Sequence, residues 1–200
     1  MSDMHSRDVS DVHRLCRSAH KQYGLTLIEL VVTIALLAIL TTLGIPSFND
    51  SIKRNRLISE VNRFVSHVQL ARSEAIKRNQ TVRICKQTNG TCNSNAQWDA
   101  GWVVFIDING DDQVQAIEEI RRFDGIASNY TLRSGVALEW VDFQSNGRPL
   151  SGSGGYPATG LDFGLCAADA EDENDQHHSR TLTLNSTGRI DLQEGTSVCP

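Results

Sequence analysis

The sequence predicts an α+β protein in which a long N-terminal helix packs on an antiparallel β-sheet domain. Three observations predict this fold: an apolar run over residues 25–45, an amphipathic helical pattern over residues 47–79, and short alternating segments rich in β-formers from residue 81 onward. The chain has 200 residues and a net charge of −5, and its length fits one globular domain with an N-terminal extension. We therefore divide it into residues 1–24, 25–46, 47–79 and 80–200.

The apolar run contains a single charge, Glu29, close to its start. A helix of 21 residues spans the roughly 30 Å hydrocarbon core of a bilayer, because each residue adds about 1.5 Å. A carboxylate costs up to about 3 kcal/mol at mid-membrane and less near an end. We predict a transmembrane helix over residues 25–46, for which an ordinary membrane anchor is the simplest interpretation. A secretory signal peptide does not fit, since its apolar core is only about 7–15 residues long.

Pro46 follows Gly44 and predicts a kink or a local break in the helix. Beyond it, apolar residues recur mostly at steps of three and four, so we predict an amphipathic helix that packs on the β domain and stops at Asn79. The apolar positions are Phe48, Ile52, Ile58, Val61, Phe64, Val65, Val68, Ala71, Ala75 and Ile76.

The remaining residues, 80–200, predict one antiparallel β domain in which turn residues separate short strands. The predicted strands are residues 81–86, 101–107, 114–123, 130–133, 136–143, 161–165, 180–185 and 188–192.

The string Gly24-Leu25-Thr26-Leu27-Ile28-Glu29-Leu30 before a long apolar run resembles the class III signal of type IV pilins and type II secretion pseudopilins. The resemblance implies that residues 1–24 are a cytoplasmic leader, which prepilin peptidase removes after Gly24 before Leu25 is N-methylated. The family usually has Phe at the position of Leu25. Glu29 would then pair with the N-terminal amine of a neighbouring subunit, which agrees with the need of a carboxylate in hydrocarbon for a partner. Pro46 ends the segment that enters the filament.

Motifs of the β domain resemble the FimT/GspH minor pilins. They are Trp98-x-x-Gly101-Trp102-Val103-Val104-Phe105-x-Asp107, Phe143-x-x-Asn146-Gly147, Leu165-Cys166, Arg180-x-Leu182-x-Leu184 and Thr187-Gly188-Arg189-Ile190. The resemblance implies a single-pass protein of the bacterial inner membrane with a periplasmic C-terminal domain, which joins other pilins in a type IV pilus or a type II secretion pseudopilus. We interpret the Trp and Phe residues of these motifs as core packing.

Five cysteines are present, of which Cys16 lies in the leader. The other four, an even number in a domain outside the cytoplasm, suggest two disulfides with three possible pairings. We expect Cys85–Cys92 and Cys166–Cys199, the pairing that the family pattern supports. The spacings do not fit the usual zinc sites.

No arrangement of residues typical of an enzyme is present, and we expect neither a cofactor nor a metal. Asp107, Asn109, Asp111 and Glu118 stand at the first, third, fifth and twelfth positions of an EF-hand-like loop, but Asp112 replaces the glycine of the sixth position. Since this run lies between two predicted strands, we interpret it as a polar turn. We likewise interpret the acidic stretch around His177 and His178 as a solvated loop.

DNA binding during natural transformation is the alternative function, because the resemblance extends to FimT relatives associated with DNA uptake. The candidate contacts are Arg148, Arg180 and Arg189. Residues 80–200 hold eight basic and seventeen acidic residues, whereas affinity for DNA comes largely from neutralised phosphates. We therefore favour a structural role.

Overall fold

The structure is a computed structural model that describes residues 24–151, 160–168 and 178–195, without the side chains of residues 42–47. It divides into two compact units, Met1–Pro46 and Ser47–Pro200. Helix α1 (Leu27–Arg78) contributes to both. The strands are β1 (Val82–Thr88), β2 (Thr91–Cys92), β3 (Trp102–Phe105), β4 (Glu119–Phe123), β5 (Tyr130–Ser134), β6 (Trp140–Phe143), β7 (Pro149–Ser151), β8 (Leu161–Ala167), β9 (Ser179–Leu184) and β10 (Ile190–Glu194).

Helix α1 is one element from Leu27 to Arg78, so the local break predicted at Pro46 is wrong. The predicted stop at Asn79 is confirmed. Asn79 adopts a left-handed backbone with φ 53°, its N–H donates to the Ile76 carbonyl at 3.3 Å, and the Gln80 N–H donates to the Ala75 carbonyl at 3.2 Å. These two bonds form a Schellman motif, which satisfies carbonyls that the helix end leaves without partners. The membrane span predicted over residues 25–46 is not found: within the described part of the chain, no helix is long and apolar enough to cross a membrane.

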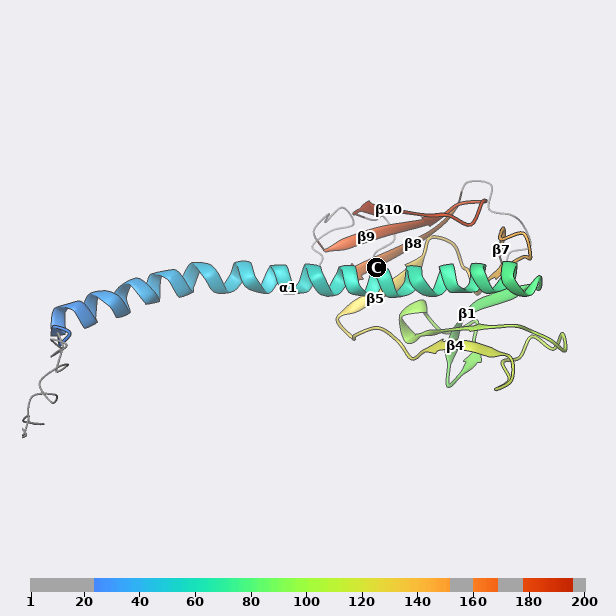
Figure 1. Ribbon diagram of the computed structural model, residues 1–200, viewed down its shortest axis with the longest axis horizontal. Helices are drawn as coiled ribbons and strands as arrows, with labels where there is room; N and C mark the ends of the chain where they lie inside the picture. The colour runs from blue at the N-terminus through green and yellow to red at the C-terminus, as the bar shows by residue number, and fades with distance from the viewer. Residues whose placement is uncertain (1–23, 152–159, 169–177, 196–200) are drawn as a thin grey trace, which may run out of the picture. The chain divides into compact units, whose positions relative to one another are not determined.

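The strands form two antiparallel sheets (Figure 1). The first has the order β4-β3-β1-β6-β7, with β2 paired to β1, and the second has the order β10-β9-β8-β5. The sequence predicted neither β2 nor β7. Three predicted strands are shorter than expected. The segment 101–107 is a strand only over Trp102–Phe105, the segment 114–123 only from Glu119, and the segment 136–143 only from Trp140.

One hydrophobic core joins the second half of α1 to both sheets, and in Figure 1 this part of the helix passes strands of each. The helix buries one continuous face: Leu57, Val61, Phe64, Val68, Ala71 and Ala75. The spacing of three and four residues places these side chains on one side of the helix. Three positions of the predicted face, Phe48, Ile58 and Ile76, are exposed instead, while Leu57 is buried in addition.

Aromatic side chains occupy the centre of the core. The Phe64 ring lies 5.0 Å from Trp102 and 4.9 Å from Phe163, and Trp98 lies 5.9 Å from it on another side. Both indole N–H groups have acceptors, since Trp98 donates to the Leu138 carbonyl at 3.1 Å and Trp102 donates to His67 Nδ1 at 2.8 Å. The core role predicted for these aromatic residues is confirmed.

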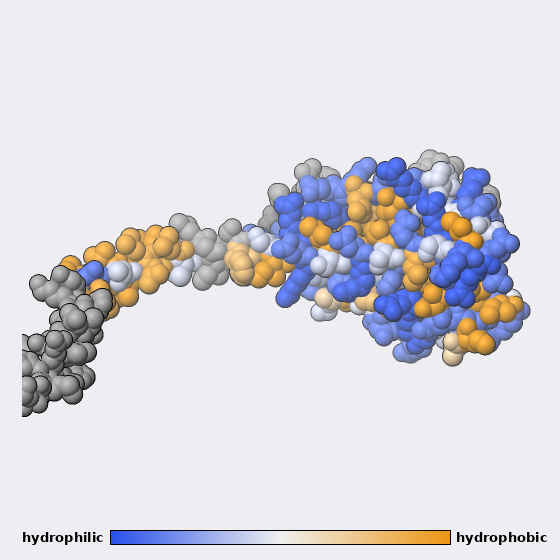
Figure 2. All heavy atoms as spheres, viewed as in Figure 1, coloured by the Kyte–Doolittle hydropathy of each residue, from blue (hydrophilic) through white to orange (hydrophobic). Residues whose placement is uncertain are grey.

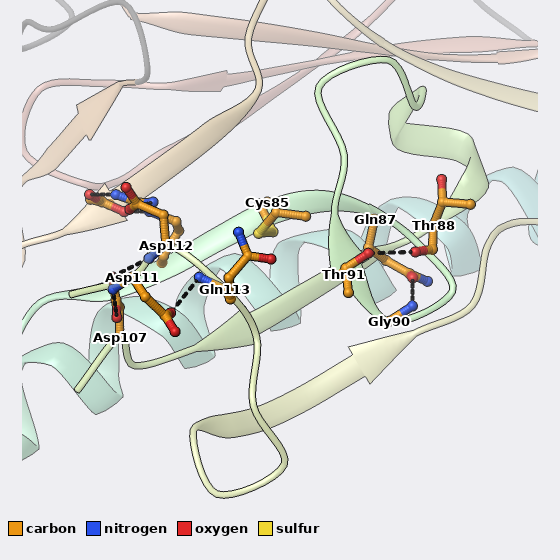
Figure 3. The surroundings of a disulfide bond; sticks show 12 residues. Cys85, Gln87, Thr88, Gly90, Thr91, Asp107, Asp111, Asp112 and Gln113 are labelled. Atoms are coloured by element: carbon orange, nitrogen blue, oxygen red, sulfur yellow. Dashed lines mark hydrogen bonds and ion pairs between the residues drawn. A yellow bond between two sulfur atoms is a disulfide. The ribbon is translucent and has the colours of Figure 1, made fainter. Parts of the chain in front are cut away.

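A disulfide joins Cys85 and Cys92, as predicted, and closes the hairpin of β1 and β2 (Figure 3). Asn89 and Gly90 turn the chain with φ values of 54° and 85°, the type I′ geometry that matches the twist of a two-residue hairpin. Cys166 is also disulfide-bonded. Cys199 lies outside the described residues, so its pairing with Cys166 stays a prediction, and Cys16 lies outside them as well.

Two turns of the recognised motifs meet against α1. Gly147 and Gly188 have φ values of 76° and 78° and lie at the turns after β6 and β9. A Cβ on Gly188 would approach the Gly147 carbonyl oxygen to 2.4 Å and Arg72 Nε to 2.8 Å, and Arg72 Nε itself donates to that carbonyl at 3.1 Å. The turn glycines therefore permit a backbone contact that links the two sheets and the helix.

Candidate functional site

The segment from Gly24 to Glu29 contains the start of α1. Thr26 Oγ1 accepts a hydrogen bond from the Glu29 N–H at 3.3 Å, and the Thr26 carbonyl accepts one from the Leu30 N–H at 3.1 Å. Thr26 thus caps the helix, which begins at Leu27. The T-x-x-E spacing is that of a capping box, a signal in the sequence that our prediction did not use. Glu29 also places a negative charge in the first turn, where the helix dipole favours it.

Gly24 has no packing reason to be glycine in this structure, because an added Cβ would meet no atom within 4 Å. This contrasts with Gly188, where an added Cβ would collide with a carbonyl.

The first half of α1 exposes apolar side chains on all sides. Every Leu, Ile and Val from residue 25 to residue 40 is exposed, from 46% for Val31 to 80% for Leu27. Figure 2 shows this stretch as a hydrophobic surface. An apolar surface of this extent is rare on a soluble monomer and marks contact with other proteins or with lipid.

The three arginines considered for DNA do not form one exposed patch. Arg180 is buried, and its guanidinium donates to Glu194 Oε1 at 3.2 Å and to the Ser179 carbonyl at 2.6 Å. Arg189 is exposed but pairs with Asp191 at 3.3 Å. Arg148 is exposed as well, and its Nε donates to the Ser186 carbonyl at 3.4 Å. The structure brings Arg148 close to the turn that carries Arg189 and withdraws Arg180 into the fold.

Comparison with protein families finds the type II transport protein GspH family over residues 60–188 and the prokaryotic N-terminal methylation motif over residues 19–45. The first match covers more than half of the chain. The chain belongs to the GspH family. It is accordingly a minor pilin or pseudopilin that carries the methylation motif ahead of its GspH domain.

The fold of this GspH protein agrees with that of solved structures. The type IV minor pilin FimU of Pseudomonas aeruginosa matches in two crystal forms, with 22% and 23% identity and TM-scores of 0.52 and 0.54. These matches cover 71% and 74% of this chain and 98% and 97% of FimU. The minor pseudopilin EpsH from the type 2 secretion system of Vibrio cholerae is similar over 70% of this chain and 97% of its own, with 10% identity and a TM-score of 0.48. No curated protein sequence matches the chain.

In the GspH domain, the connection between β3 and β4 gathers acidic residues. Carboxylate oxygens of Asp107, Asp111 and Glu118 lie within 4.8 Å of one another. Asn109 is hydrogen-bonded to Asp111 in the same turn. The backbone N–H of Gln113 donates to Asp111 at 2.8 Å, and this bond holds the pKa of the Asp111 carboxyl below its usual value.

Of the two histidines singled out in the sequence, His178 is described and does not belong to this acidic cluster. His178 precedes β9, and His177 lies outside the described residues. The three carboxylates are the group of His, Cys, Asp and Glu side chains in the described residues whose geometry would suit a metal ion.

Proposed function

We propose that this GspH protein is a structural, non-enzymatic subunit that enters a type IV pilus or a type II secretion pseudopilus through residues 25–46. The exposed apolar surface of the first half of α1 carries the proposal, because water penalises such a surface and a bundle of similar helices would bury it. Other pilins or pseudopilins are the partners that would supply those helices.

Before assembly, the chain would be held in the inner membrane with residues 1–24 in the cytoplasm and the β domain in the periplasm. Prepilin peptidase would cut after Gly24, and Leu25 would become N-methylated. The methylation motif over residues 19–45 supports this order of events. Mass spectrometry of the purified protein should find Leu25 as the first residue, heavier by one methyl group. Intact residues 1–24 in the assembled protein would contradict the proposal.

Glu29 would pair across subunits with the amine of Leu25. A carboxylate withdrawn from water needs an opposite charge, and the new N-terminal amine of a neighbouring copy would supply one. Glu29→Ala should therefore leave cleavage largely intact and strongly reduce recovery of the protein in sheared filaments.

Thr26→Ala is the matched control for Glu29→Ala, because it removes the cap of the same helix and keeps the carboxylate. If Glu29 acts between subunits, Thr26→Ala filaments are recovered nearly as well as the wild type. If both variants fail equally, Glu29 serves only to start the helix. Normal recovery of Glu29→Ala would sink the proposed role.

No second function is proposed. The alternative of DNA uptake needs a converging basic surface, and Arg180 is engaged inside the fold with Glu194. The net negative charge of the β domain also disfavours DNA binding, since it repels phosphate.

A further inference from the structure

The connection between β3 and β4 holds three carboxylates close enough to share one cation. The oxygens of Asp107, Asp111 and Glu118 lie within 4.8 Å of one another. Two oxygens that bind the same Ca²⁺ at about 2.3–2.6 Å lie at most about 5 Å apart. The distances in this cluster therefore meet that limit without any movement of the chain.

Glu118 provides an independent sign of a missing partner. Its side chain is buried, with the residue 3% exposed, and Oε1 accepts a hydrogen bond from the Ile108 N–H at 3.0 Å. Oε2 is also buried, and within the described structure no hydrogen-bond donor reaches it. A buried carboxylate oxygen without a partner is unfavourable, and a cation at the cluster would satisfy it.

The backbone holds Glu118 in this place. Its N–H donates to the Gln115 carbonyl at 2.9 Å, and its carbonyl accepts the Ile106 N–H at 3.0 Å. Glu118 is thus held in place immediately before β4, with a carboxylate oxygen within 4.8 Å of carboxylate oxygens of Asp107 and Asp111.

Backbone N–H groups of the following turn hold the Asp107 carboxylate in place. Asp107 Oδ1 accepts the N–H groups of Gly110 at 2.7 Å and Asp111 at 3.2 Å, and Oδ2 accepts that of Asp112 at 3.0 Å. Figure 3 labels Asp107 together with Asp111 and Asp112. An ionised carboxylate has about four acceptor sites, so Asp107 keeps capacity for a metal.

Asp112 stands where an EF-hand loop has glycine, and it adopts the left-handed backbone, with φ 58°, that the glycine supplies. Its side chain pairs with Arg83, which also donates to Asp142 of β6 at 2.6 Å. Asp112 is therefore compatible with the loop and is engaged outside the cluster.

We propose that Asp107, Asp111 and Glu118 bind one Ca²⁺, which fixes the β3–β4 connection against the edge of the first sheet. The donors are all oxygen, which suits hard cations and not zinc. Calcium fits better than magnesium because it accepts several carboxylates in irregular geometry, whereas magnesium demands a near-ideal octahedron and keeps its waters. Water would complete the coordination. The site is independent of the proposed assembly role.

The test uses the full chain purified in detergent and stripped of metal with EGTA. Calorimetric titration with CaCl₂ should give one ion per chain with a Kd on the order of 10⁻⁴ M or tighter. Millimolar Ca²⁺ should also raise the Tm and slow proteolysis at the β3–β4 connection. The same concentration of Mg²⁺, or KCl at equal ionic strength, should do neither.

Two pairs of variants locate the ion. Glu118→Gln and Asp111→Asn should each weaken Ca²⁺ binding at least about tenfold, because each removes one of three charges that face the cation. Glu119→Gln and Asp112→Asn make the same change of charge at neighbouring residues outside the cluster, and both should retain binding. Asp111 is exposed, so its variant keeps the test valid even if Glu118→Gln unfolds.

Three outcomes would overturn the proposal. One is no uptake of Ca²⁺ by the wild type at millimolar concentration. A second is an equal rise of the Tm with Mg²⁺ or KCl, which would be a general ionic effect. A third is an equal loss of binding in the control variants, which would indicate diffuse attraction by acidic residues.

Discussion

At Gly188, a turn of the second sheet lies close to a turn of the first sheet and to Arg72 of α1. The Gly147 carbonyl lies where a side chain at residue 188 would begin, and Arg72 donates to the same carbonyl. The absence of a side chain at Gly188 therefore allows its turn to approach the turn of Gly147. Neither glycine tolerates substitution as an exposed turn residue does.

We expect Gly188→Ala to lower the free energy of unfolding of residues 47–200 by ~2–4 kcal/mol, from backbone strain and a collision with a carbonyl. Gly110→Ala is the control, because Gly110 has a similar φ of 75° but open space around its Cα. It should cost only roughly 1 kcal/mol. Urea denaturation of both variants measures the difference, and equal costs would refute the contact between the turns.

His67 is a buried residue whose protonation state affects the stability of the fold. Burial, together with the nearby charges of Arg121 and Arg63, lowers the pKa of His67, and its Nδ1 accepts the Trp102 indole N–H. The neutral imidazole is therefore the form that the fold accommodates.

This lowered pKa predicts a loss of stability in mild acid. The unfolded chain binds a proton at His67 near pH 6.5, whereas the folded chain resists it until lower pH, so stability is complete above about pH 6.5 and falls as the pH decreases below it. His67→Gln, which keeps an acceptor for Trp102, should flatten this decline. Denaturation of residues 47–200 at about pH 7 and about pH 5.5 tests the prediction, and equal slopes for variant and wild type would contradict it.

Among the elements, α1 combines two kinds of surface. Residues beyond Pro46 bury one face against the β domain, whereas residues 25–40 bury none in the single chain. The buried face depends most on Phe64, whose ring contacts Trp98, Trp102 and Phe163.

Phe64→Ala should therefore destabilise residues 47–200 by about 3–5 kcal/mol, because it leaves a cavity among large rings. Phe48→Ala makes the same change on the same helix at a position that is 67% exposed, and it should alter stability by less than about 0.5 kcal/mol. Thermal or urea unfolding of the two variants gives the comparison. A small effect of Phe64→Ala would show that the helix is not part of the cooperative core.

Sequence patterns identified the long strands and the helix end, and they failed where a tertiary contact decides. The segment 136–143 alternates like a strand, but its first half leaves the sheet and only Trp140–Phe143 pairs with β1. Strands β2 and β7 have two and three residues, which is too short for an alternating pattern to be recognised in the sequence. Pro46 was expected to kink or locally break the helix, whereas α1 is one element from Leu27 to Arg78.

The candidate sites show the same limit. Asp107, Asp111 and Glu118 had a suggestive spacing in the sequence, but only the fold reveals that Glu118 is buried with a free oxygen. Arg180 was predicted as a possible DNA contact, but the structure shows that it is buried and paired with Glu194. The spacing of these polar residues did not indicate which of them are buried, and burial decides both cases.

At the scale of the whole molecule, charge is divided unevenly along the chain. Residues 49–79 carry seven basic and three acidic residues, and residues 80–200 carry eight basic and seventeen acidic residues. Several of the helix cations are already engaged, since Arg78 pairs with Glu74 at 2.6 Å and Arg54 with Glu194 at 3.2 Å.

We therefore expect a fragment of residues 49–200 to cause no salt-sensitive shift of duplex DNA in gels at micromolar protein. Measurements at two salt concentrations separate counterion release from other binding. A shift that weakens with salt, and that Arg148→Ala and Arg189→Ala abolish, would restore DNA uptake as a function.

The cap at Thr26 has an electrostatic consequence for the processed chain. Removal of residues 1–24 would leave a cationic amine on Leu25, two residues before the helix begins, and the first turn of a helix already carries partial positive charge. The two like charges repel, so cleavage by itself weakens the helix start that Thr26 secures. Glu29, one turn inward, is the charge that offsets this repulsion, and a mature chain without it would fray at its own first turn before it met any neighbour.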